Sequence, residues 1–156
     1  MAERLVVDAS VAAKWFLKDE ADVDLADDLL LQMLEEKVEA FGPALLTYEV
    51  AWLLIRAHRA ASAPPGTTRL SREKVFECLR KFFGIPIRIE LAEEGSSVGA
   101  TELSLTHVKN YYEMVYVRLA EDLGCRWCTA DEKAWRGAGP TFPIERILPL
   151  ADFGRG

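Results

Sequence analysis

The fold of this chain is decided by a six-residue stretch near its start, LVVDAS at residues 5–10. Three apolar residues run directly into a carboxylate and two small residues, which is typical of a strand buried on both faces. The next residues, VAAKWF at 11–16, predict the first turns of a helix that ends near residue 17. Because ligands of an open parallel sheet bind beyond the carboxyl ends of its strands, Asp8 is a candidate binding group.

The bulk composition predicts one domain. The chain has 156 residues, half of them hydrophobic, which allows a hydrophobic core of the usual domain size. We expect a single domain over residues 1–150 and a flexible C-terminal tail over 151–156. No apolar stretch approaches the roughly 18 residues of a membrane helix, and residues 1–4 lead into the first strand without a signal segment. We therefore expect a cytoplasmic protein that makes no membrane contact.

Charge and cysteine content narrow the function classes. The formal net charge of −6 argues against a broad nucleic-acid-binding surface, which would be basic, but it suits a site that gathers carboxylates around metal cations. Three cysteines in a chain of this length argue against a disulfide framework. Cys125 and Cys128 have C-x-x-C spacing, and we interpret them as small buried residues because no further zinc ligands and no redox-motif context are evident.

Apolar spacing and turn residues predict the remaining elements. Helices are expected at 21–39, 48–56, 70–83, 92–105, 111–123 and 134–136, strands at 44–46, 87–91, 126–129 and 144–148, and a loop at 62–68. Strands that alternate with helices imply parallel crossover connections. The predicted fold is therefore an α/β protein, a three-layer α/β/α sandwich around a mostly parallel sheet.

Four carboxylates occupy related positions among these elements. Asp8 and Asp131 each end an apolar strand, and Glu49 and Glu113 each lie near the start of an apolar helix. Taken singly, the two Asp residues could cap helices and the two Glu residues could be favoured by the helix dipole. As a set they predict a site for Mg²⁺ or Mn²⁺, which prefer oxygen ligands and offset the repulsion among carboxylates. Such ions activate water and clamp a scissile phosphodiester.

Several other residues are candidates for supporting roles. Thr129 lies two residues before Asp131, so both side chains can point to one end of the sheet, although it could equally be an ordinary strand residue. Ser10 could cap the first helix or hydrogen-bond a metal-bound water. Candidate phosphate contacts are Lys14, Arg56, Arg59, Lys109 and Arg118. We interpret Tyr111, Tyr112 and Tyr116 as core or dimer-interface residues rather than base-stacking platforms.

Four segments, in order along nearly the whole chain, carry a resemblance to a known family: residues 6–16, 45–52, 112–125 and 128–133. In these segments the sequence resembles PIN-domain proteins, and particularly the VapC-type toxins of toxin–antitoxin pairs. The resemblance implies a compact α/β/α domain, a divalent-metal site and ribonuclease activity. It also implies Asp8, Glu49 and Asp131 as acidic site residues, a homodimer, and an antitoxin that blocks the site.

One position departs from the family pattern. Members usually carry Asp within a Tyr-Asp-Ala-x-Tyr type of segment, where residues 112–116 of this chain read YEMVY, with Glu113 in place of that Asp. Glu keeps the charge but adds one methylene, so its oxygens reach further by roughly 1 to 1.5 Å. A misplacement on the order of 1 Å can cost about 100-fold in rate.

These observations lead to three functional hypotheses. The first is a Mg²⁺- or Mn²⁺-dependent endoribonuclease, the toxin of a type II toxin–antitoxin pair, which cleaves RNA through metal-activated water. Its catalytic and metal-binding residues would be Asp8, Glu49, Glu113 and Asp131, supported by Thr129 and Ser10. The second is a PIN-fold binding or regulatory module in which Glu113 leaves weak or no nuclease activity. A receiver-type phospho-acceptor domain is disfavoured because the chain lacks the expected acidic pair and later Lys.

Overall fold

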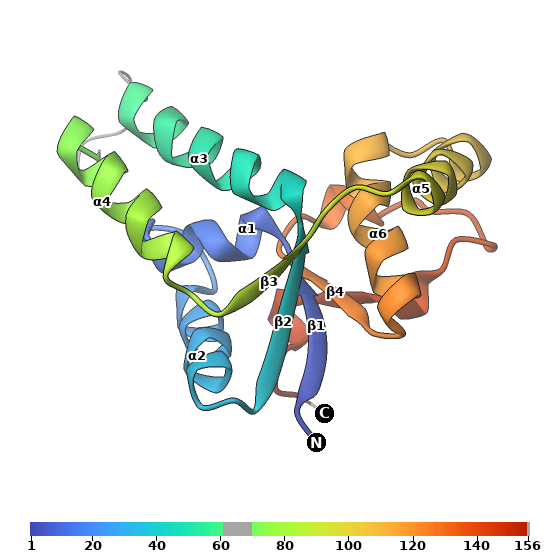
Figure 1. Ribbon diagram of the computed structural model, residues 1–156, viewed down its shortest axis with the longest axis horizontal. Coiled ribbons are helices and arrows are strands. Elements are labelled where there is room, and N and C mark those ends of the chain that lie inside the picture. The colour runs from blue at the N-terminus through green and yellow to red at the C-terminus, as the bar shows by residue number, and fades with distance from the viewer. Residues whose placement is uncertain (61–69, 156) are drawn as a thin grey trace.

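A five-stranded sheet forms the centre of the structure, a computed structural model that describes residues 1–60 and 70–155 (Figure 1). The strand order is β3-β2-β1-β4-β5, and all four pairings are parallel. The strands are β1 (Glu3–Val7), β2 (Val38–Pro43), β3 (Ile87–Glu90), β4 (Arg126–Thr129) and β5 (Ile147–Pro149). The predicted loop at 62–68 lies outside the described residues.

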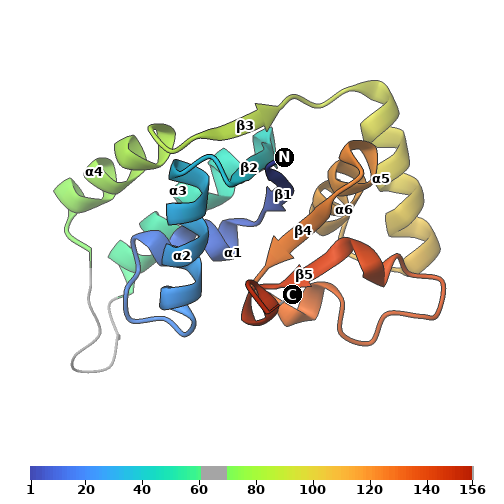
Figure 2. The same cartoon turned by 90° about the horizontal axis from the view of Figure 1, so that it is seen from below.

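Helices cover both faces of the sheet. They are α1 (Ala9–Ala12), α2 (Val23–Leu34), α3 (Ala44–Arg59), α4 (Arg72–Phe83), α5 (Glu94–His107) and α6 (Tyr111–Leu123), and a 3₁₀ turn over Ala13–Trp15 extends α1. Helices α1 to α4 lie on one side of the sheet and α5 and α6 on the other (Figures 1 and 2). The predicted three-layer α/β/α sandwich is therefore confirmed.

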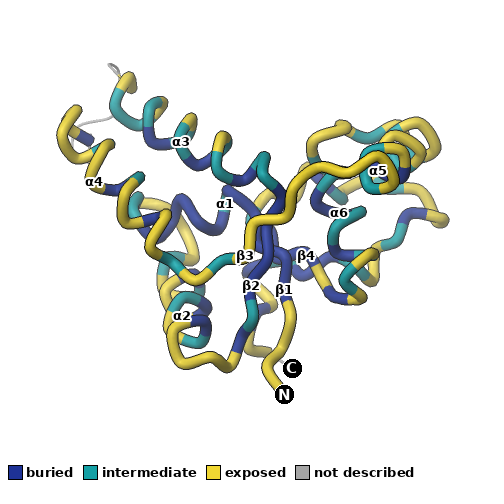
Figure 3. The backbone as a smooth tube through the Cα atoms, viewed as in Figure 1, coloured by how far each residue is buried: buried dark blue, intermediate teal, exposed yellow. Residues whose placement is uncertain are grey.

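The central strand shows why the sequence folds in this way. Leu5, Val6 and Val7 are all fully buried, because helices cover both faces of β1 and leave no side that needs polar residues. Buried residues follow β1, β2 and β4 and the inner surfaces of the helices, whereas the edge strand β3 and the outer surfaces are largely exposed (Figure 3). Strands β1 and β4 are neighbours with Val7 opposite Cys128, so their carboxyl ends finish at the same edge.

The second strand and the helices around it were placed wrongly by sequence reasoning. The helix expected over 21–39 ends at Leu34, the strand occupies 38–43, and the apolar residues 44–46 form the first turn of α3. Glu36 takes a left-handed φ of 58° without being glycine, so the sequence carries no stop signal there. Gly42 leaves room for the side chain of Leu46, which a Cβ at this position would overlap. Pro43, the last residue of β2, is the N-cap residue of α3.

The part of the chain that packs into the core continues further toward the C-terminus than expected. Residues 144–146 form a 3₁₀ turn before β5, and a second such turn covers Leu150–Asp152. Leu150 and Phe153 are buried, with 1% and 4% of their surface exposed. The packed domain therefore extends to Phe153, three residues beyond the boundary predicted at residue 150.

The cysteines and the helices agree with the predicted character of the chain. Cys78, Cys125 and Cys128 are buried and unpaired, as expected for small core residues. None of the helices within residues 1–60 and 70–155 combines the length and the apolar character needed to cross a bilayer.

Phe153→Ala tests whether the end of the chain is part of the core. Removing this buried ring leaves a cavity and should lower the free energy of unfolding by about 3 to 5 kcal/mol, measured by urea denaturation. Phe83→Ala removes the same side chain from a position that is 65% exposed and should change the free energy much less. Equal effects of the two substitutions would contradict the packing of Phe153.

Candidate functional site

Asp8 sits directly after the central strand and is held firmly. It is the N-cap residue of α1, and its Oδ2 accepts hydrogen bonds from the Ser10 amide at 3.2 Å and from the hydroxyls of Ser10 and Thr129, the latter at 3.1 Å. Only 8% of Asp8 is exposed, and burial raises the pKa of its carboxyl while these hydrogen bonds oppose the increase. No hydrogen bond from a described residue reaches Oδ1, which remains available to a ligand.

Ser10 and Thr129 join the ends of the two central strands. The Ser10 hydroxyl accepts a hydrogen bond from the Ala130 amide at 3.0 Å, and the Thr129 hydroxyl accepts one from the Asp131 amide at 3.1 Å. Asp131 in turn caps the short turn that follows, accepting from the Lys133 amide at 3.0 Å. Both Asp residues therefore act as helix caps, and the same caps fix where their carboxylates lie.

Glu49 lies in a different turn of its helix from the one predicted. It is in the second turn of α3, because α3 begins at Ala44, so the interaction with the helix dipole expected in a first turn does not apply. Its Oε1 accepts a hydrogen bond from the Tyr116 hydroxyl at 2.7 Å. Burial raises the pKa of Glu49, Tyr116 opposes the increase, and the charges of Asp8 and Glu113 add to it.

Tyr116 is a site residue whose role sequence reasoning missed. The expectation that it is a core residue is confirmed, since only 1% of it is exposed and its ring stacks on Trp127 at 5.3 Å. Burial holds the pKa of its hydroxyl well above the ordinary value, so the group stays protonated and donates to Glu49. The available signal was its spacing three residues after Glu113, which places both on one side of a helix.

Glu113 lies in the first turn of α6, as predicted. Asn110 is the N-cap residue of the helix, and its side chain accepts a hydrogen bond from the Tyr112 amide at 2.9 Å. Glu113 is half-buried. Burial raises the pKa of its carboxyl, the charges of Asp131 and Asp8 raise it further, and Lys109 opposes them.

All four predicted carboxylates face one cavity of about 360 Å³. Its lining consists of Asp8, Leu45, Glu49, Asn110, Tyr112, Glu113, Tyr116, Trp127 and Asp131. No Lys or Arg is among these residues, so the four carboxylates make the cavity negatively charged. The structure thus brings together side chains from four separate parts of the chain.

The donor set fits a hydrated divalent cation. In the part of the chain that the structure describes, no group of three or more His, Cys, Asp or Glu side chains is arranged so that it could hold a metal ion by itself. Mg²⁺ does not need one, because it usually keeps several waters and takes only one or two carboxylates directly. Asp8 offers its free Oδ1, and Glu49, Glu113 and Asp131 surround a cavity large enough for an ion with its waters.

The candidate phosphate contacts are not equivalent. Lys14 is buried and pairs with Glu20 at 3.1 Å, Arg118 pairs with Asp122 at 2.8 Å, and the guanidinium of Arg59 lies over the ring of Trp52. Lys109 acts on the cavity through its effect on Glu113. The Lys109 ammonium itself donates to the Arg136 carbonyl at 3.3 Å and lies over the Phe142 ring. The ammonium of Lys14 is paired and buried, which contradicts its prediction as a phosphate contact.

No protein-family model and no curated protein matches the chain, but solved structures do. VapC20 of Mycobacterium tuberculosis, a toxin that cleaves the sarcin–ricin loop, matches with a TM-score of 0.57 and 13% identity over 77% of this chain and 83% of its own. A toxin–antitoxin complex from Klebsiella pneumoniae matches with 0.61 and 9% over 94% and 97%. VapBC2 from Rickettsia felis, bound to a promoter DNA fragment, matches with 0.62 and 10% over 94% and 98%. The chain has the fold of VapC-type PIN domains.

Glu113→Gln tests the mutual repulsion of the four carboxylates in metal-free protein. The pKa values of Asp8, Glu49 and Glu113 are raised in the folded state, so the folded chain binds more protons than the unfolded chain as pH rises from about 4 towards neutral. The free energy of unfolding should therefore fall over this range. Glu113→Gln should weaken that fall and stabilise the metal-free protein at neutral pH, with little effect near pH 4.

Urea denaturation in EDTA across this pH range measures the effect. Glu102→Gln is the matched control, because Glu102 is exposed on α5 and does not line the cavity. A Glu113→Gln protein with the same pH dependence as the parent would contradict the repulsion.

Proposed function

We propose that this chain is a divalent-metal-dependent endoribonuclease and the toxin of a type II toxin–antitoxin pair. The observation that supports this most directly is the single cavity on which Asp8, Glu49, Glu113 and Asp131 converge. It lies beyond the carboxyl ends of β1 and β4, where open parallel sheets bind ligands. The fold shared with VapC toxins agrees with the proposal.

Each side chain has a definable part in the reaction. A bound Mg²⁺ or Mn²⁺ would activate a water for attack and offset the charge that develops on the phosphodiester. Asp8 would help to hold the ion with a carboxylate whose Oδ2 is fixed by Ser10 and Thr129. Tyr116 orients Glu49, and the cap at Lys133 orients Asp131.

The charge of the cavity makes RNA binding depend on the metal. A phosphodiester is repelled by four carboxylates, and the lining residues include no cation that would neutralise them. The four carboxylates would hold a divalent ion, whose positive charge would offset this repulsion. Lys109 is near enough for its charge to lower the pKa of Glu113, and it would add attraction for the RNA backbone.

The proposed partners, an antitoxin and a second copy of the chain, rest on the shared fold and on the family resemblance. Solved structures with this fold include toxin–antitoxin complexes, and we propose a protein antitoxin that blocks the cavity. We also propose a homodimer, as the resemblance implies, acting on RNA in the cytoplasm. The second candidate, a binding or regulatory module, is favoured by the longer side chain of Glu113, and it predicts RNA binding without turnover.

Asp8→Asn tests the nuclease activity. Purified protein incubated with RNA and Mg²⁺ or Mn²⁺ should cleave the RNA, EDTA should abolish cleavage, and Asp8→Asn should lower the rate by at least about 100-fold, because it removes the best-anchored ligand. Asp24→Asn, an exposed Asp on α2, should cleave like the parent.

Two results would contradict this proposal. Equal cleavage by the parent and Asp8→Asn would point to a contaminating nuclease, and no cleavage by either protein would leave the binding module as the better explanation. Denaturing gels with end-labelled RNA distinguish these outcomes.

Tyr116→Phe tests the support of Glu49. The substitution keeps the ring stacked on Trp127 and removes only the hydroxyl that donates to Glu49. The affinity for Mn²⁺, measured on the protein alone by calorimetry or electron paramagnetic resonance, should fall by about 10-fold. Tyr48→Phe, at an exposed position on α3, is the control. Unchanged Mn²⁺ affinity in a normally folded Tyr116→Phe protein would exclude the support.

A further inference from the structure

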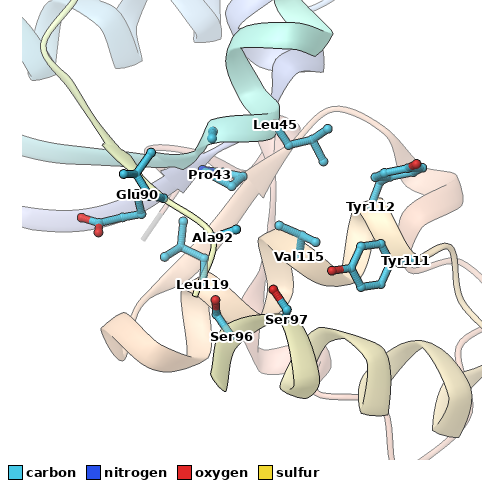
Figure 4. Close-up of a pocket in the computed structure, with 12 residues that line it drawn as sticks. Pro43, Leu45, Glu90, Ala92, Ser96, Ser97, Tyr111, Tyr112, Val115 and Leu119 are labelled. Atoms are coloured by element: carbon cyan, nitrogen blue, oxygen red, sulfur yellow. The ribbon is translucent and has the colours of Figure 1, made fainter. Parts of the chain in front are cut away.

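A second cavity of about 200 Å³ adjoins the acidic one and differs from it in character (Figure 4). It lies between the start of α3, the segment after β3, and helices α5 and α6. Apolar side chains, including Leu45, Val115 and Leu119, form much of its wall. Leu45 and Tyr112 line both cavities, so the two spaces share a wall.

The hydroxyl groups of Ser97 and Tyr111 line one edge of this apolar cavity. Figure 4 shows the Ser97 side chain and the Tyr111 hydroxyl pointing toward Val115. Among the described residues, neither the Ser97 hydroxyl nor the Tyr111 hydroxyl has a hydrogen-bond partner. The cavity thus combines an apolar wall with free groups that can both donate and accept, which suits a flat ligand with a polar rim.

We infer that this cavity binds one unpaired nucleobase of the RNA, next to the phosphodiester held in the acidic cavity; the inference rests on the proposed nuclease function. A base is joined to its phosphate through a single ribose, so the base beside a phosphodiester bound in the acidic cavity is within reach of the adjoining space. The RNA would pass from the acidic cavity to the apolar one beside Leu45 and Tyr112, which line both.

The lining favours a base over the phosphate backbone. No Lys or Arg lines this cavity, and Glu90 adds negative charge, so a second phosphate would be repelled. Aromatic surface is available at the rim, since Tyr112 is 59% exposed and Tyr111 38% exposed, with their rings edge to face at 5.8 Å. This exposure contradicts the core alternative of the prediction for the two tyrosines and leaves the dimer-interface alternative as a prediction. Stacking on such rings accepts any base.

The experiment is an abasic scan combined with a cavity-filling variant. A short single-stranded RNA is prepared with one nucleotide at a time replaced by an abasic ribose. Binding is measured by fluorescence anisotropy with Ca²⁺, and cleavage with Mg²⁺ or Mn²⁺. Ser97→Phe fills the cavity from α5 without altering any of the four carboxylates. Thr101→Phe, one turn further along α5 at an exposed position, adds the same side chain outside the cavity.

The expected result is position-specific. One abasic position, adjacent to the cut, should weaken binding to the parent protein by roughly 5- to 100-fold, the range expected for one stacked base. Ser97→Phe should bind the intact RNA about as weakly and lose the abasic effect, whereas Thr101→Phe should keep it. Catalysis at bound RNA should remain measurable in Ser97→Phe, because the acidic cavity is intact.

Two outcomes separate this inference from the proposed function. An abasic effect that is unchanged in Ser97→Phe, or absent in the parent, overturns the base-binding role even if RNA is cleaved, and leaves an apolar segment of a protein partner as the occupant. The expected binding pattern without any cleavage upholds the base-binding role and overturns only the nuclease activity.

Discussion

The structure depends on burying one carboxylate at the end of its central strand. A buried carboxylate is costly unless hydrogen bonds replace the water it loses, and Asp8 meets this requirement through Ser10 and Thr129. Ser10 lies in α1, directly after β1, and Thr129 is the last residue of β4. The Asp8 amide also donates to the carbonyl of Cys128 at 3.0 Å. The pairing of the central strands and the geometry of the site therefore rest on the same few bonds.

The remaining carboxylates add repulsion that the fold does not relieve. Burial and mutual charge raise the pKa values of Glu49 and Glu113 in the same direction as that of Asp8. A chain selected only for stability would replace at least one of them with an apolar residue. Local conflicts of this kind are expected where a site is kept for a ligand, and the proposed divalent cation would turn the repulsion into attraction.

The sequence predicted the parts of the fold whose local and tertiary signals agree. Strands β1 and β4 carry apolar runs that end in Asp, and α6 has both an Asn110 cap and a Gly124 stop, so these elements were placed correctly. Residues 38–46 were not, because a short apolar run has no period that separates strand from helix. The burial of Phe153 likewise depends on distant packing partners, which no local pattern reveals.

Helix α6 shows why the site could be predicted only in part. Glu113 and Tyr116, three residues apart, face the acidic cavity, while Val115 and Leu119 face the apolar one. Helical spacing alone predicts two such faces, but it does not say that Tyr116 meets Glu49 from another helix or that Tyr112 stands between the cavities. Since helix α6 contributes to the walls of both cavities, the proposed metal and base sites would be linked through it. On that proposal, the extra methylene of Glu113 would act on the spacing of the two sites and not on the metal site alone.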